Sequence, residues 1–201
     1  MLRNASFLWR LIEMPPKCKF TKDEIVNSAL NIVRKNGFEA LTARNLAAEL
    51  NSSPKPIFGL FQNMYELQTE VLILAEKLYN NYISNDMASG KYPPYKASGM
   101  AYIRFAKEEK ELFKLLFMRD RSNENTNDSH EELRPFLEII KNSLNLSEDD
   151  AFIFHIELWV FVHGIATMIA TSYLDWDMDF VSAALTDTYN GLKHRFTEGK
   201  N

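Results

Sequence analysis

An apolar pattern with the period of an α-helix runs through almost the whole chain, and it limits the fold more than any other feature. Between residues 22 and 36, apolar side chains recur at the spacing of one helical face, at Ile25, Ala29, Ile32 and Val33. Thr21 and Glu24 have the spacing of a capping box before this segment, and Gly37 follows it, where a left-handed cap is expected. The alternating patterns typical of β-strands are nearly absent, so the sequence predicts an all-α fold.

Helix start and stop signals divide the chain into about nine helices. The second is expected to begin after Thr42 and to end before Asn51. The third is expected to have Ser53 as its N-cap and Pro54 as its first residue, and to end near Phe61; because Pro56 disfavours helical dihedrals at Lys55, the alternative is a start shifted by two residues. The later elements are expected as helices at about residues 64–85, 95–109, 111–118, 135–144, 148–173 and 178–196, with connectors at 87–94 and 122–130.

Two short helices separated by a tight turn within residues 42–61 have the layout of a helix-turn-helix. In such a unit the second helix presents its first residues to base edges in the major groove, and the first lies across the backbone. Arg44 and Lys55 would supply positive charge near phosphates, and free N–H groups at the helix starts would add further donors. The alternative is a compact helical corner with no role in binding DNA.

The charge distribution fits a DNA-reading segment attached to a part that does not bind DNA. Residues 14–63 contain seven Lys or Arg against four Asp or Glu, a net charge of +3. Residues 64–201 contain 14 against 22, a net charge of −8. Averaged over the chain, the net charge of −4 hides this asymmetry.

The N-terminal part, residues 20–72, resembles the DNA-binding domain of TetR family regulators. The resemblance is carried by Ala29-Leu30, by Asn36 to Phe38, by Leu41 to Ala47 and by the Phe-x-x-x-x-Glu-Leu of Phe61 to Leu67. Carried over position by position, it implies DNA contacts by Thr42, Ala43, Arg44, Ser53, Lys55, Pro56, Phe58 and Gly59.

Three positions depart from the family pattern. Phe58 stands where a tyrosine is usual, and it can pack but cannot donate a hydrogen bond to a phosphate. Pro56 replaces a small residue, and Met64 replaces a common lysine. These departures predict fewer phosphate contacts or a different operator.

The C-terminal part resembles one branch of the same family. Residues 102–117 resemble its fifth and sixth helices, and residues 158–170 resemble the Trp-x-x-x-His-Gly signature of its eighth. The resemblance implies a small organic effector inside the helical bundle and a two-fold homodimer formed by the last two helices. Apolar and aromatic residues are available to line such a pocket, or simply to form core: Phe105, Phe113, Phe117, Met118, His155, Trp159, His163 and Met168.

No metal, cofactor or catalytic activity is expected. His155 and His163 are eight residues apart, which separates them by about 12 Å along a helix axis, too far to chelate one metal by themselves. The sequence has no phosphate-binding loop and no Ser or Cys with His and an acid in a known motif context. Gly164, beside His163, is expected to permit close helix packing.

The first thirteen residues are apolar, but Arg10 and Glu13 interrupt the run and no small-residue cleavage site follows. We therefore expect Met14 to be the true start, with residues 1–13 an upstream extension; the alternative is a frayed amphipathic arm.

No apolar run reaches the roughly 18–20 residues of a membrane span, and the single Cys18 fits a reducing cytoplasm.

The sequence thus predicts a helix-turn-helix domain at residues 14–66 and a ligand-binding and dimerisation domain at 67–201. The function expected is that of a cytoplasmic, homodimeric repressor on a palindromic operator, released by a small organic molecule. An activator, or a regulator without a ligand, remains an alternative within that class. The alternative from another class is a helical ligand-binding or interaction protein whose N-terminal part no longer reads DNA.

Overall fold

All regular secondary structure in the described residues is helical, which confirms the all-α expectation. The computed structural model describes residues 19–120, 122 and 129–198; the expectations for residues 1–13, and for most of the connector at 122–130, lie outside this range. Along the chain the elements are α1 (Lys22–Asn36), η1 (Phe38–Ala40), α2 (Ala43–Glu49), α3 (Lys55–Phe58), α4 (Met64–Ala88), α5 (Pro94–Glu108), α6 (Lys110–Phe117), α7 (Ser129–Leu144), α8 (Glu148–Ala170) and α9 (Met178–Thr197).

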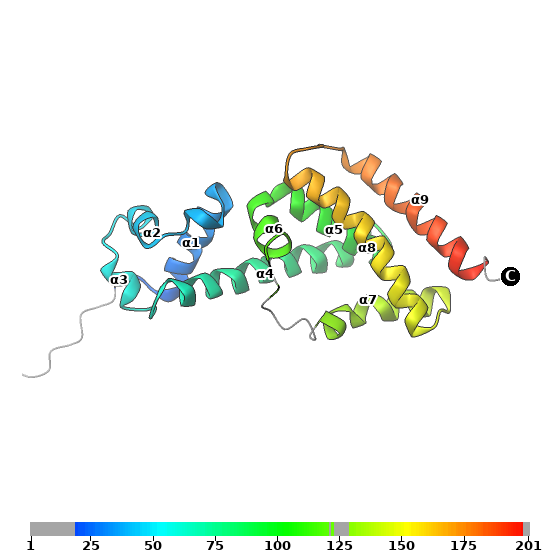
Figure 1. The fold of residues 1–201 in the computed structure, drawn as a ribbon, viewed down its shortest axis with the longest axis horizontal. Helices are drawn as coiled ribbons and strands as arrows, with labels where there is room; N and C mark the ends of the chain where they lie inside the picture. The colour runs from blue at the N-terminus through cyan, green and yellow to red at the C-terminus, as the bar shows by residue number, and fades with distance from the viewer. Residues whose placement is uncertain (1–18, 121, 123–128, 199–201) are drawn as a thin grey trace, which may run out of the picture.

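The helices α1–α3 form a small group at one end of an elongated molecule, and α5–α9 form a larger bundle at the other (Figure 1). We call α1–α3 the head and α5–α9 the body. Helix α4 belongs to both, because it begins beside the head and runs along the body (Figure 1). Its buried residues Leu67, Val71 and Ala75 recur every four positions, so one face of α4 carries a continuous core.

The start of α1 has the predicted capping box. The Thr21 hydroxyl accepts a hydrogen bond from Glu24 N at 3.1 Å, and the Glu24 carboxylate accepts one from Thr21 N at 2.8 Å. After α1, Gly37 adopts φ = 82°, a region that L side chains rarely enter. A Cβ at this position would also lie 3.1 Å from Glu111 Oε2, so glycine serves both the turn and the approach of α6.

The beginning of α3 differs from the prediction. Ser53 makes no capping bond, Pro54 occupies the cap position with helical dihedrals, and the helix ends at Phe58 instead of near Phe61. An N-cap side chain bonds the N–H of the second or third helical residue; after Ser53 these are Lys55 and Pro56, and Pro56 has no N–H, so only one of the two usual donors is present. The sequence signal at Ser53 was therefore misleading.

Three other boundaries were also predicted wrongly. Helix α7 begins at Ser129, so Pro135 lies inside the helix instead of at its first position. Helix α8 stops at Ala170 because Ser172 takes a positive φ of 58°, and Tyr173 N bonds back to Met168 O. Helix α4 continues three residues past 85, and η1 was not expected.

Helix α8 corrects one expectation from composition. It is long and apolar enough to cross a membrane by length and composition alone, although His155, Glu157 and His163 interrupt it. In the structure its buried side packs on α5, α6, α7 and α9. A core helix of a bundle passes the same composition test, so this finding is weak evidence for a membrane span.

An ion pair joins the head to the body. Arg34 near the end of α1 donates from Nε to Glu109 Oε2 at 2.7 Å and from Nη2 to Glu109 Oε1. These hydrogen bonds to Glu109 raise the pKa of Arg34. The Glu109 side chain, at the junction of α5 and α6, is only 8% exposed, whereas Arg34 is 41% exposed. The two hydrogen bonds from Arg34 thus offset the cost of removing the Glu109 carboxylate from water.

This unequal exposure predicts unequal costs for removing the two partners. Arg34→Met strands the buried Glu109 carboxylate and should lower the free energy of unfolding by about 3 kcal/mol. Glu109→Met leaves a guanidinium that water can solvate, so the loss should be about 1 kcal/mol. Urea unfolding of both variants and of the double variant measures this, and the double variant should resemble Glu109→Met. Equal costs for the two single variants would contradict the account.

Candidate functional site

Local bonds hold α2 and α3 in a helix-turn-helix arrangement. The Thr42 hydroxyl accepts from Asn45 N at 3.2 Å and caps α2 as predicted. The turn after α2 depends on Asn51 at φ = 47°, and Ser52 N closes it by bonding Ala47 O at 2.9 Å. Fully buried Ile57 anchors α3 to the core. The orientation of α3 is thus fixed by packing and by one left-handed residue.

Most of the residues predicted to contact DNA lie on the surface of this unit. Thr42, Arg44, Ser53, Lys55, Phe58 and Gly59 are exposed, while Ala43 and Pro56 are half-buried. The structure therefore brings the eight positions together on α2, the turn and α3.

Arg44 and Lys55 are cations without partners. Neither side chain has an ion-pair or hydrogen-bond partner among the described residues, whereas Lys22 and Arg34 in the same head are paired with carboxylates. An exposed, uncompensated cation keeps its full charge for an anionic ligand. Phe58, three residues after Lys55 and thus on a neighbouring part of the α3 surface, is 47% exposed. Its ring faces solvent instead of packing into the core.

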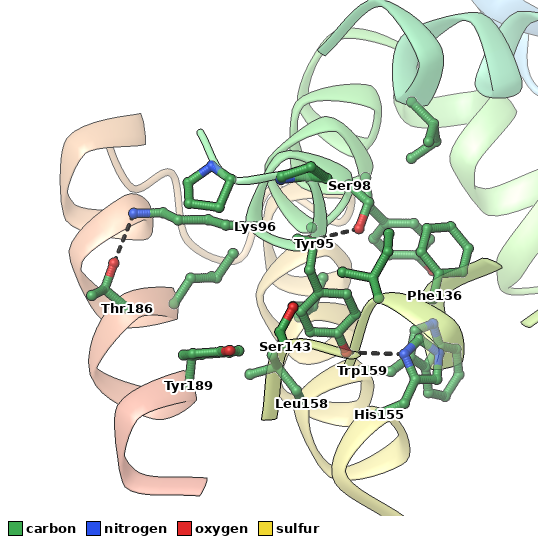
Figure 2. A pocket seen from close by; sticks show the side chains of 18 of the residues that line it. Tyr95, Lys96, Ser98, Phe136, Ser143, His155, Leu158, Trp159, Thr186 and Tyr189 are labelled. Carbon is green, nitrogen blue, oxygen red and sulfur yellow. Dashed lines mark hydrogen bonds between the residues drawn. The ribbon is translucent and has the colours of Figure 1, made fainter. Parts of the chain in front are cut away.

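A cavity of about 540 Å³ lies inside the body, between residues of α4, α5, α7, α8 and α9. This volume is within the range of roughly 300–1,000 Å³ that is usual for pockets that bind drug-sized molecules. Figure 2 shows aromatic side chains of α5, α7, α8 and α9 around it, with Tyr95 in the middle and His155, Trp159 and Phe136 on one side of Tyr95.

Two of the eight predicted ligand residues, His155 and Trp159, line the cavity. The other six do not line it. Phe105 and Phe113 are fully buried core residues, and Phe117 packs half-buried against the same core. Met118 and Met168 are exposed, and His163 contacts Tyr102 one turn beyond Trp159.

Sequence reasoning missed most of the polar residues of the cavity. Tyr79 on α4, Tyr95 and Lys96 on α5 and Tyr189 on α9 line it. In the sequence, the only sign of a cavity-lining residue was a polar group on an otherwise apolar helix. That sign does not tell which helices pack around the cavity. That information depends on how five helices pack.

Two tyrosine–histidine pairs give the region its polarity. The Tyr95 hydroxyl and His155 Nδ1 share a 2.9 Å hydrogen bond, and the Tyr102 hydroxyl and His163 Nδ1 share one of 2.8 Å. Rings stack on both imidazoles: Phe136 on His155 at 5.9 Å between centroids, and Trp159 on His163 at 5.0 Å. Each histidine therefore satisfies a buried phenol within an aromatic wall.

Burial fixes the protonation states of these groups. It lowers the pKa of His155 to about 4 and also lowers the pKa of His163. The same desolvation raises the pKa of Tyr95 and of Tyr102. At pH 7 the two pairs are therefore uncharged hydrogen bonds. Within the part of the chain that the structure describes, no group of three His, Cys, Asp or Glu side chains is placed to hold a metal ion.

The depressed pKa of His155 predicts a loss of stability in acid. The unfolded chain takes up this proton as the pH falls below about 6.5 and the folded protein only near pH 4, so stability is complete at pH 7 and falls through this window. Between pH 7 and 4.5 the contribution is about 2 kcal/mol. Urea unfolding at both pH values should show a correspondingly smaller loss for His155→Gln than for the wild type. Identical pH dependence of His155→Gln and wild type would refute this assignment.

Comparison with known proteins identifies the body. A family described as "Tetracyclin repressor-like, C-terminal domain" matches residues 95–189, which run from the start of α5 into α9. No curated protein matches the chain. The matched residues contain both C-terminal segments that resemble the family in sequence, 102–117 and 158–170. This match covers 95 of the 201 residues, and on an all-α fold it places the body in the family of tetracycline repressor-like C-terminal domains.

Proposed function

We propose that the protein is a homodimeric DNA-binding regulator, a repressor whose hold on a palindromic operator is released by an organic molecule in the body cavity. The observation that carries the proposal is that Arg44 and Lys55, on the exposed side of a helix-turn-helix, have no partner among the residues that the structure describes. The family membership of the body supports it.

The head offers the contacts that a duplex needs. Arg44 on α2 suits the phosphate backbone, and Lys55 at the start of α3 suits a phosphate or the acceptor edge of a guanine. The exposed ring of Phe58 can contact a thymine methyl group or a sugar. Because α3 is only one turn long, few side chains can reach the bases, so phosphate contacts should supply most of the affinity.

A second copy of the chain fits the outer face of α8. Ile153 and Val160 are 47% and 58% exposed, and with Gly164 they lie at i, i+7 and i+11 on one helical face. Phe180 at the start of α9 is also about half exposed. Among the described residues, a Cβ at Gly164 would meet no atom within 4 Å, so the close helix packing expected at this glycine does not occur inside one chain. It leaves room for the helix of a partner.

Helix α4 supplies a route from cavity to head. Tyr79 and Ile83 of α4 line the cavity, and Leu67 near its first turn lies in the core that α4 shares with α1. A ligand that changes the position of α4 would change the spacing of two heads in a dimer. Such control requires that the ligand bind the two arrangements with different affinity.

One observation favours a second function, that of an interaction protein that does not bind DNA. The four-residue α3 and the exposed Phe58, which lacks a phenol hydroxyl, give the head few polar groups that could bind a phosphate. An exposed aromatic ring can equally belong to a protein contact.

A mobility shift with the DNA upstream of the protein's own gene, at low and moderate salt, separates the two functions. We expect sequence-preferring binding, which Lys55→Ala and Arg44→Ala each weaken. Each substitution should also reduce the slope of log Kd against log salt by about 1, since one phosphate contact is lost. The matched control is Lys91→Ala, an exposed lysine beyond the far end of α4. The absence of sequence preference at low salt would rule out the regulator.

Gly164→Leu tests the dimer. Within one chain the side chain enters open space and leucine is the better helix former by about 1 kcal/mol, so unfolding stability of the monomer should not fall. At the proposed interface the same side chain obstructs the partner helix. Analytical ultracentrifugation should therefore show a wild-type dimer and a weakened or monomeric Gly164→Leu variant. A monomeric wild type, or an unaffected variant dimer, contradicts the proposed interface.

A further inference from the structure

The cavity contains an uncompensated positive charge. Of the described residues that line it, Lys96 is the only one with an ordinarily charged side chain. Lys96 Nζ donates to Thr186 Oγ1 at 2.7 Å and lies 4.8 Å from the centre of the Tyr92 ring. Neither partner is an anion, and within the described chain no carboxylate lies within 4.0 Å of Nζ. A partly buried ammonium without a counterion gains from any anion that reaches it.

The remaining cavity wall is neutral. His155 is uncharged at pH 7 because burial lowers its pKa to about 4. The hydroxyls of Tyr79 and Tyr189 have no hydrogen-bond partner in the described part of the chain, so they are free to bind a polar atom of a ligand. Helix α5 also begins at the cavity, at Pro94, without a side-chain cap, and its dipole adds to the positive potential there.

Charged and apolar parts of the cavity lie apart. In Figure 2, Lys96 reaches toward Thr186 of α9, whereas Phe136, His155 and Trp159 lie on the other side of Tyr95. A ligand that satisfies both regions has an acid group at one end and an apolar body at the other. A cationic ligand would meet Lys96 and find no lining carboxylate to pair with.

We propose that the cavity binds an organic carboxylate whose acid group pairs with Lys96 and whose apolar body lies among the aromatic rings. This inference rests on the proposed function, since it names the class of molecule that would control the regulator. The carboxylate replaces, or bridges, the hydroxyl of Thr186 as a partner of Nζ, and Tyr189 on the same helix can donate to it.

Matched ligands of different charge test the proposal on the purified full-length protein. The probes are 4-phenylbutyrate, 4-phenylbutyramide and 4-phenylbutylamine, and the corresponding decanoate, decanamide and decylamine. Thermal shift and calorimetry should show each carboxylate binding about tenfold or more tighter than its amide, the ratio expected for one charge-assisted hydrogen bond, and the amines not binding. Equal or tighter binding of the amides or amines overturns the proposal, as does the lack of stabilisation by either carboxylate at millimolar concentration.

Substitutions of Lys96 test whether this side chain causes the preference for the carboxylate over the amide. Lys96→Met should weaken carboxylate binding to the level of the amide and leave amide binding unchanged, while Lys96→Arg should retain the preference. The matched control is Lys110→Met, because Lys110 also bonds a neutral hydroxyl, that of Ser172, but lies outside the cavity lining. If Lys96→Met does not fold, Thr186→Val provides the second test. It keeps the lysine and removes its neutral partner, so the carboxylate preference should persist or increase, and its loss counts against the proposal.

These outcomes are separate from those of the proposed function. Ligand binding is measured without DNA, and DNA binding of the unliganded protein is measured without ligand. A carboxylate preference in a protein that does not bind DNA would retain the site and reject the regulator. Sequence-specific DNA binding without any carboxylate preference would do the reverse.

Discussion

The contact between Arg34 and Glu109 makes the head and the body one unit, and the proposed regulation depends on it. Glu109 is buried at the junction of α5 and α6, so it requires a partner, and α1 supplies that partner from the head. Gly37 lets the chain turn directly beside Glu111 of α6. The apolar core continues through the same region, from Ile25 in α1 to Leu185 in α9. A displacement in the body therefore cannot leave the head unaffected.

The cavity lies in the body. The recognition surface, which is the exposed helix-turn-helix surface that carries Arg44 and Lys55, lies in the head. The cavity is enclosed by α4, α5, α7, α8 and α9 and lined by uncharged aromatic groups, with one lysine at the α5–α9 side. The recognition surface is exposed, and its cations Arg44 and Lys55 have no partner in the described part of the chain. Helix α4 is the element that both share, since Tyr79 lines the cavity and Leu67 packs near the head. In the proposed regulator, a ligand would therefore act on DNA binding through α4, without lying near the DNA.

What could be predicted from the sequence was what local interactions decide. The capping box of Thr21, the cap of Thr42 and the turn at Asn51 each depend on residues within a few positions, and the structure has all three. The false start at Ser53 shows a limit of the same reasoning, because a capping residue was present but Pro56 removed one of the two N–H groups that it could bond. Helix ends that depend on a left-handed serine were not visible in the sequence either, as at Ser172.

The candidate ligand site was less predictable, for a physical reason. Whether an aromatic residue lines a cavity or fills the core depends on how helices far apart in sequence pack together. Phe105 and His155 look equally suitable in the sequence, yet Phe105 is fully enclosed by core atoms while His155 faces the cavity with Tyr95. Lys96 gave no sequence signal, because a lysine near a helix start is ordinarily a solvated surface residue.

The central claim is that two copies of the chain read a symmetric DNA site. Repeated selection of bound molecules from a pool of random-sequence duplexes, with the purified protein at low salt, tests it most directly. The account predicts enrichment of a palindrome whose half-sites are centred about one helical turn, 10–10.5 base pairs, or a multiple of it, apart. Enrichment of a single, non-repeated half-site, or of no sequence at all, would contradict it.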